Sequence, residues 1–349
     1  MAKRIKTKSE AVSPSRLPTS YDVAQLAGVS QSAVSRCFKT GGSISAATRR
    51  KVLRAAAQLG YKPNALASGL ITNRSNMVAV LISNLTNLYY PEVLASLTAK
   101  LDARGVRVLL FALPTEADAD AALDQVWRYR VDGAIVAARL SSEHLRSFGQ
   151  NRVPVVLYNR FGEDVAVPTV CCDSIGGERL LVEKLLAAGH RRFGIIGGPL
   201  DSYVGRQRVE GAVAALSEAG IEPVITNGHF DHDSGVAGFR RLMTMSDNRL
   251  DAVICVNDLM AIGAIDAARE VYGLDVPRDV SVVGFDGVEP AAWASYRVTT
   301  VRQPVGRMTE AAVSMLMEHI ADPDLPPEVR TFAGKLQPGS SARLGGADQ

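Results

Sequence analysis

The sequence predicts an all-α helix-turn-helix headpiece joined to an α/β body of two doubly wound, parallel-sheet lobes. Residues 19–62 show short helical patterns separated by glycines. From Met77 onward, short apolar strand patterns alternate with helical patterns, which is typical of parallel sheets covered by helices on both faces. This second part is roughly 270 residues long, which is large for one such sheet, so we expect two similar lobes.

Charge is distributed unevenly along the 349 residues, although the net charge is only +3. Residues 1–75 hold 13 Lys and Arg against Glu10 and Asp22, whereas the remainder of the chain is acidic overall. A basic head on an acidic body indicates a module that binds a polyanion, joined to a body that does not. The alternative is a solvated basic tail, but eight of the 13 positive charges lie beyond residue 18, outside the tail.

The first helix of the headpiece carries Val23, Ala24, Leu26 and Ala27 on what we expect to be one apolar face. Gly28 should end this helix, because glycine takes a left-handed C-cap without steric cost. Ser30 should then cap the next helix.

The second helix presents a row of hydrogen-bonding side chains opposite its buried face. Ala33, Val34 and Cys37 form the apolar side. The polar row consists of Gln31, Ser32, Ser35 and Arg36. A helix, a glycine turn and a second helix with such a row make a helix-turn-helix, whose second helix fits the DNA major groove.

A third helix is predicted over residues 46–59, capped by Ser45 and ended by Gly60, with Val52, Leu53, Ala56 and Leu59 on one face. Its basic side chains are Arg49, Arg50, Lys51 and Arg54. Contacts from such residues to phosphates set affinity rather than sequence choice.

Four segments follow from this pattern: a disordered basic tail over residues 1–18, a helix-turn-helix domain over 19–62, a short helix with its linker over 63–75, and the two-lobed body over 76–349. The short helix after Pro63 spans about two turns, which is below the length of a stable isolated helix. Ser68 and Gly69 weaken it further.

The body pattern predicts eight strands and eight helices. The strands are near residues 77–82, 106–111, 133–137, 154–158, 169–172, 193–197, 252–256 and 280–285. The helices are near residues 90–104, 117–130, 141–150, 175–188, 204–219, 234–245, 258–272 and 305–320. We expect the first lobe to begin at residues 77–90 and the second at 193–206, with a ligand cleft beyond the carboxyl ends of the strands.

Several function classes find no support in the sequence. Cys37, Cys171, Cys172 and Cys255 lack metal-binding spacing and are expected to be buried, reduced thiols. No signal peptide or membrane-length apolar run is present, so we expect a cytoplasmic protein. No catalytic constellation or metal site is indicated, and we expect no cofactor. The run 194–198 resembles only a fragment of a phosphate-binding loop.

The chain resembles the lactose-repressor (LacI/GalR) family of bacterial transcription regulators. The headpiece match lies in Tyr21-Asp22-Val23-Ala24, Ala27-Gly28-Val29-Ser30 and Val34-Ser35-Arg36, followed by Leu59-Gly60-Tyr61 and Pro63-Asn64. The body match includes Thr86-Asn87-Leu88-Tyr89-Tyr90, Asn257-Asp258, Gly284-Phe285-Asp286 and Thr299-Thr300-Val301-Arg302-Gln303-Pro304. The resemblance implies a periplasmic-binding-protein-like body.

This resemblance implies a headpiece that reads a near-palindromic double-stranded operator as part of a homodimer. The DNA-contacting positions that it implies are Tyr21, Ser30, Gln31, Ser32, Ser35, Arg36, Ser45, Thr48, Asn64, Ala67 and Leu70. A Gln side chain is suited to bidentate hydrogen bonds with adenine, and an Arg side chain to those with guanine. The alternative for Arg36 is a phosphate contact. Leu70 matches the position at which the family inserts an apolar side chain into a central base step and bends the duplex. The alternative is that Leu70 packs between the hinge and the body. Gly69 departs from the family pattern and should disfavour hinge folding.

The resemblance also implies a small, sugar-like effector in the cleft. The implied effector contacts are Tyr89, Tyr90, Asn159, Arg208, Phe230, Asn257 and Asp286. The alternative role for Asp286 and Arg208 is a purely structural ion pair. The alternative role for either tyrosine is packing in the core between the lobes. Asp173 is better explained as a helix cap than as a ligand contact.

The resulting prediction is a non-enzymatic, DNA-binding regulator, most simply a repressor, controlled by a sugar or sugar acid. The alternatives are a solute-binding protein, which shares the body architecture, and an α/β enzyme acting on a small polar metabolite. The last residues lack the apolar heptads of a tetramerising tail, which favours a dimer. No membrane partner is expected.

Overall fold

The computed structural model describes residues 16–38, 42–62, 74–83, 85–113, 118–162, 164–247 and 249–345. The chain divides into two compact units, residues 1–75 and 76–349. Most of the predicted tail and hinge segment, including Asn64, Ala67 and Leu70, lies outside the described residues.

The first unit contains the predicted helices α1 (Ser20–Ala27), α2 (Gln31–Phe38) and α3 (Ala46–Leu59). Gly28 and Gly60 end α1 and α3 at φ values of 65° and 64°, as only a residue without a Cβ does at little cost. Thr19 and Asp22 form a capping box at the start of α1 that the sequence reading had missed. The small core includes Val23, Val34, Val52 and Ala56.

Two leucines expected on the apolar faces are instead exposed, Leu26 by 47% and Leu53 by 45%. A helix turns about 100° per residue, so Leu26 lies roughly 110° away from the centre of the face formed by Val23, Ala24 and Ala27. Leu53 is likewise turned one residue away from buried Val52. Three short helices enclose only a narrow apolar stripe, and these two positions fall outside it.

The second unit contains two six-stranded sheets. The first has the order β11-β5-β4-β3-β1-β2 and is parallel throughout. Its strands are β1 (Met77–Ser83), β2 (Arg107–Leu113), β3 (Gly133–Ala137), β4 (Val155–Tyr158), β5 (Thr169–Cys172) and β11 (Val329–Phe332). The second has the order β12-β10-β9-β8-β6-β7, with β12 alone antiparallel within it. Its strands are β6 (Phe193–Gly197), β7 (Val224–Asn227), β8 (Ala252–Cys255), β9 (Ser281–Asp286), β10 (Thr299–Arg302) and β12 (Lys335–Gln337).

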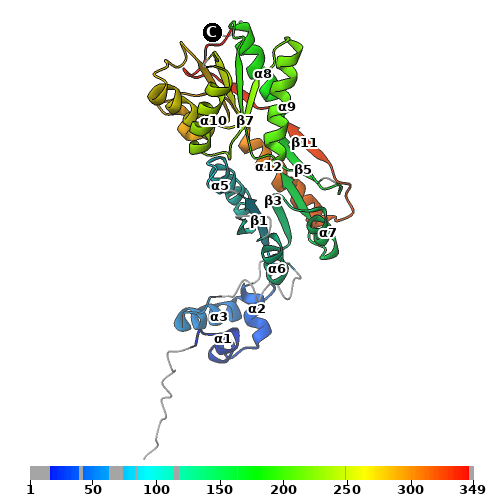
Figure 1. Cartoon of the computed structure of the whole chain (residues 1–349). Helices are drawn as coiled ribbons and strands as arrows, with labels where there is room; N and C mark the ends of the chain where they lie inside the picture. Colours follow the sequence, from blue (N-terminus) through cyan, green and yellow to red (C-terminus); the bar gives the residue numbers. More distant parts are fainter. Residues whose placement is uncertain are drawn as a thin grey trace, which may run out of the picture. The chain divides into compact units, whose positions relative to one another are not determined.

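Helices cover the sheets of both lobes, and the predicted fold class is confirmed (Figure 1). The first lobe carries α5 (Tyr89–Asp102), α6 (Ala119–Tyr129), α7 (Ser142–Gln150) and α12 (Val305–Ala321). The second carries α8 (Ser174–Ala187), α9 (Tyr203–Glu218), α10 (His232–Met245) and α11 (Asp258–Asp266), with the short turns η2 (Ala267–Val271) and η3 (Glu289–Ala292). The central strands β3 and β8 are fully buried and β1 is buried except at its two ends, which explains their continuous apolar runs.

The chain passes between the lobes three times, which corrects the expected lobe boundaries. The second lobe begins at α8 rather than at β6, because α8 packs on α9 and beside β10. The chain then returns to the first lobe for α12 and β11, and enters the second again for β12. Figure 1 shows the late strand β11 beside β5. At the crossings, the backbone N–H of Asp173 donates to the Phe332 carbonyl at 2.8 Å.

Candidate functional site

A cavity of about 980 Å³ lies between the two lobes. Its first-lobe wall is formed by segments that follow β1, β3 and β4, and its second-lobe wall by segments that follow β6 and β9 together with the start of α9. These are carboxyl ends of parallel strands, where open α/β sheets bind their ligands. The cavity therefore lies where the strand pattern placed a cleft.

Six of the seven predicted effector residues line this cavity. They are Tyr89, Tyr90, Asn159, Arg208, Phe230 and Asp286. Asn257 is not among the lining residues and has a capping role instead. Its Oδ1 accepts from the Met260 N–H at 3.1 Å at the start of α11, and its Nδ2 donates to the Phe230 carbonyl at 2.9 Å. The Asn257 amide thus caps α11 with its oxygen and holds the Phe230 backbone with its nitrogen.

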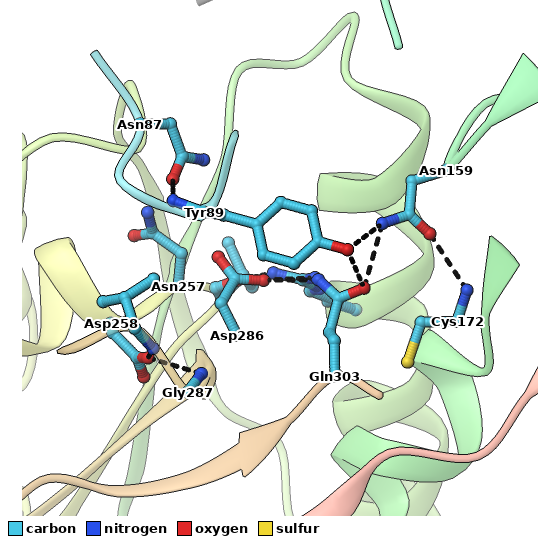
Figure 2. A network of polar contacts seen from close by, with 12 residues as sticks. Asn87, Tyr89, Asn159, Cys172, Asn257, Asp258, Asp286, Gly287 and Gln303 are labelled. Carbon is cyan, nitrogen blue, oxygen red and sulfur yellow. Dashed lines mark hydrogen bonds and ion pairs between the residues drawn. The ribbon is translucent and has the colours of Figure 1, made fainter. Parts of the chain in front are cut away.

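Gln303 joins the two lobes through a polar network of residues that line the cavity (Figure 2). Its Oε1 accepts from the Tyr89 hydroxyl at 3.0 Å and from Asn159 Nδ2 at 2.9 Å, both on the first lobe. Its Nε2 donates to Asp286 Oδ1 at 2.7 Å on the second lobe. Because Gln303 lies directly between β10 and α12, at a crossing, the network links the lobes at their connection. Gln303 lies within the family-like run 299–304, but no signal in the sequence assigns it a role.

Asp286 and Arg208 form a buried ion pair with 2.8 Å between Arg208 NH2 and Asp286 Oδ1. The guanidinium also donates from NH1 to the Val256 carbonyl and stacks on the Phe285 ring, 3.9 Å from its centre. Burial raises the pKa of Asp286, and Arg208 opposes this rise. The ion pair that the alternative expected is present, and the same two side chains also line the cavity.

Three cavity residues other than glycine have positive φ values. They are Asn159 at 51°, Phe230 at 63° and Asp286 at 113°. Such conformations are costly for residues with a Cβ and persist where the surroundings hold them in place. Their gathering around one cavity supports its assignment as a functional site.

Tyr89 is both a core residue and a cavity residue. It is only 3% exposed, and its hydroxyl also lies 3.1 Å from that of Tyr158. Burial raises the pKa of Tyr89 well above its ordinary value. The phenol thus stays protonated at neutral pH and can donate to Gln303. Tyr89 therefore packs in the core, as the alternative expected, and also lines the cavity, where an effector contact would lie.

In the headpiece, two of the predicted DNA-contacting residues, Ser30 and Ser45, form hydrogen bonds at the starts of helices. Ser30 Oγ accepts from the Ala33 N–H at 3.3 Å, and Ser45 Oγ accepts from the Thr48 N–H at 3.1 Å. Both serines are exposed, and Tyr21 is 71% exposed.

The polar row of α2 lies at the surface of the headpiece. Ser32 and Arg36 are exposed, while Gln31 and Ser35 are half-buried. Gln31 Nε2 donates to Ser20 Oγ at 3.2 Å, and Arg36 Nε donates to the Ser32 carbonyl at 3.3 Å. These bonds orient the two side chains while leaving further donors open for another partner.

Within the part of the chain that the structure describes, no group of three or more His, Cys, Asp or Glu side chains is placed to hold a metal ion. The predicted helix cap at Asp173 is confirmed, since its Oδ1 accepts from the Gly176 N–H at 2.8 Å. The phosphate-loop fragment at 194–198 contacts the Phe230 ring, because a Cβ at Gly198 would lie 2.7 Å from Phe230 Cε1. None of the described helices is both long and apolar enough to span a membrane.

Comparison with known families gives two matches along the chain. Residues 19–64 match the model described as bacterial regulatory proteins, lacI family, and residues 182–342 match the periplasmic binding protein-like domain. The HTH-type transcriptional repressor PurR of Proteus mirabilis is 32% identical over 314 residues, covering 88% of this chain and 91% of that protein. The ribose operon repressor of Escherichia coli is 32% identical over 317 residues, covering 88% and 95%.

Solved structures of related proteins match nearly the whole chain. The lac repressor dimer bound to operator and the anti-inducer ONPF superposes with a TM-score of 0.85 at 27% identity, covering 93% of this chain and 99% of that one. The complex of the transcriptional regulator CelR with cellobiose superposes with a TM-score of 0.71 at 31% identity, with the same coverage. The chain therefore belongs to the lacI family of bacterial regulatory proteins.

Proposed function

We propose that this chain is a sequence-specific, DNA-binding transcriptional repressor whose operator affinity is controlled by a small polar metabolite bound between its lobes. The observation that carries the proposal is the Gln303 network, which connects both walls of the cavity at a point where the chain crosses between lobes. A ligand that enters this cavity contacts both lobes and can change how they are arranged.

The headpiece supports the DNA-binding part of this proposal. Its second helix exposes Ser32 and Arg36 beside half-buried Gln31, a set that can hydrogen-bond to base edges. The exposed basic side chains of α3 are suited to phosphates; they are Arg49, Arg50, Lys51 and Arg54. We propose that two headpieces in a homodimer read the half-sites of a near-palindromic operator.

The cavity composition supports a ligand with both hydroxyl groups and an apolar face. Asp286 offers a carboxylate acceptor for hydroxyl donors, and the Phe230 ring offers an apolar surface for the C–H face of a sugar. The cellobiose complex of CelR and the operator complex of the lac repressor are consistent with a sugar and with DNA as the two ligands of this chain. We propose a sugar or sugar acid as the effector.

Control requires that the ligand favour one lobe arrangement over the other. A coupling free energy of about 1–3 kcal/mol is typical between two such sites, which corresponds to a change of roughly 5–150-fold in operator affinity. We propose no catalytic role and no cofactor. We also propose that the protein is cytoplasmic and associates with the nucleoid.

The test compares the full-length protein with a variant that lacks residues 1–70. An operator is first selected from a pool of random duplexes by the full-length protein. Fluorescence anisotropy then measures binding to that operator, and a thermal-shift screen measures metabolite binding. We expect the truncated protein to lose operator binding and to keep the metabolite hits. Operator binding by the truncated protein would refute the domain assignment, and hits that leave operator affinity unchanged would refute the control.

A further inference from the structure

We propose that the effector is an anion, a polyhydroxylated molecule with a carboxylate or phosphate group, and that Arg160 holds its charge. This proposal rests on the proposed function, since it names the chemical class of ligand for the same cavity.

The first observation is the charge balance of the cavity wall. Four arginines among the described residues line it against two aspartates; they are Arg139, Arg160, Arg206 and Arg208 against Asp201 and Asp286. Arg208 pairs with Asp286 at 2.8 Å, and Arg139 pairs with Asp201 at 3.3 Å. Among the described residues, no carboxylate forms an ion pair with Arg160 or Arg206. The wall therefore carries a surplus of positive charge, which attracts anions into a cleft.

The second observation is that Arg160 is oriented without being neutralised. The residue is half-buried, its NH1 donates to the Asn159 carbonyl at 2.7 Å, and its NH2 donates to the Tyr90 hydroxyl at 3.0 Å. Both acceptors are uncharged, so they fix the guanidinium and leave its charge without a counterpart. A guanidinium has five N–H donors, and a planar guanidinium held in this way is suited to bind a carboxylate or phosphate in a bidentate manner.

The third observation is that Arg160 is the next residue in the sequence after Asn159, a member of the Gln303 network. Its neighbour Asn159 donates to Gln303, and Gln303 in turn donates to Asp286. One ligand can therefore place hydroxyls toward Asp286 and an anionic group toward Arg160 within the same cavity. Arg206, exposed two residues before Arg208 on α9, adds to the positive potential.

The fourth observation is that contacts between the lobes bridge the cavity. The Arg139–Asp201 pair joins the segment after β3 to the segment after β6. Phe161, after β4, packs on Tyr203 of α9 with 4.8 Å between ring centres. A ligand enclosed behind these contacts displaces water from Arg160. A neutral ligand would leave this cation desolvated without a counter-charge, which is unfavourable, whereas an anion supplies one.

The test uses matched neutral and anionic probes with the full-length protein. The panel contains D-glucose, D-galactose, D-ribose and D-fructose beside their uronic acids, aldonic acids and phosphate esters where these exist. Thermal shift ranks the probes, calorimetry at constant ionic strength measures the hits, and operator release is scored by anisotropy. The variants are Arg160→Gln, Arg160→Lys, and Arg146→Gln as control. Arg146 is exposed on α7 of the same lobe and does not line the cavity.

We expect the tightest hits to be anions. Arg160→Gln should lower the affinity for the anionic probe by about tenfold or more, because hydrogen bonds to charged groups are stronger than neutral ones. The same substitution should change the affinity for the matched neutral probe by less than about threefold. Arg160→Lys should fall between wild type and Arg160→Gln, and Arg146→Gln should match wild type. Neutral hits that release the operator, or an anion bound equally well by Arg160→Gln, would overturn the anion proposal and leave the proposed function standing. If no probe of either class binds and none releases the operator, both proposals fail.

Discussion

The buried carboxyl group of Glu178 makes the stability of the body depend on pH. Glu178 lies on α8 with no exposed surface, and neither carboxyl oxygen has a hydrogen-bond partner among the described residues. Burial raises the pKa of Glu178 to about 8, although Arg208 opposes this rise. The folded protein therefore holds a proton on Glu178 at neutral pH that the unfolded chain releases.

The sign and size of the effect follow from this difference in pKa. The ordinary glutamate value is 4.5, so the folded state binds more protons than the unfolded state between that value and about pH 8. Stability due to Glu178 is thus fully present below the unfolded pKa and is lost as the pH rises toward the folded one, by about 1.4 kcal/mol per pH unit. Between about pH 6 and about pH 8, the loss amounts to roughly 2 kcal/mol, since the slope lessens near the folded pKa.

The substitution Glu178→Gln removes this proton and keeps the shape of the side chain. We expect the wild-type free energy of unfolding to fall by about 2 kcal/mol more than that of Glu178→Gln between these two pH values. Urea unfolding followed by circular dichroism measures both. The buried Asp258 also has its pKa raised by burial, to about 7, and its own titration contributes to the pH dependence of both proteins.

The matched control is Glu183→Gln, an exposed position on the same helix. It should follow the wild-type pH dependence. If Glu178→Gln and wild type lose stability in parallel over this interval, Glu178 is not a protonated group in the folded state.

Three further variants test the network, the headpiece and the cavity. Gln303→Leu removes three buried hydrogen bonds, one of them to a carboxylate, so the free energy of unfolding should fall by about 2–4 kcal/mol in urea titrations; a loss below about 0.5 kcal/mol would count against the network. Thr19→Ala removes the cap of α1 and should cost the headpiece about 1 kcal/mol, seen as a lower midpoint in thermal melts, whereas an unchanged midpoint would contradict the capping box. Gly198→Ala places a methyl group against the Phe230 ring and should weaken effector hits in calorimetry while retaining operator binding; undiminished hits would show that the ring tolerates the shift.

The headpiece was predictable because its signals are local. Gly28 and Gly60 end their helices through their own backbone freedom, and Ser30 and Ser45 cap helices within three residues. Asp173 is a cap of the same kind. Most of the buried strands were equally visible, because a strand covered on both faces gives a continuous apolar run. Each of these features depends on neighbours close in sequence. The buried strand β10 was not predicted, since it begins with Thr299 and Thr300 and has no such run.

The features missed by the sequence reading depend on distant partners. The strands β11 and β12 are three or four residues long and partly exposed, so they carry no apolar run. They become strands because β5 and β10 offer them open edges. Gln303 gained its role from Tyr89, a residue more than two hundred positions earlier. Asn257 resembled a ligand contact but serves as a cap, since a polar residue after a strand fits both roles.

The repeated crossing between lobes has a consequence for synthesis on the ribosome. The first lobe begins with β1 at Met77, but its sheet is complete only when β11, ending at Phe332, has emerged. At bacterial elongation rates of about 5–20 residues per second, this interval lasts on the order of 10–50 s. From the synthesis of β5 until β11 emerges, β5 has an unpaired edge, and until α12 emerges the first lobe lacks its covering helix. The nascent chain therefore exposes apolar surface and an open strand during a long part of its translation, and this is the period in which chaperones are best placed to prevent its aggregation.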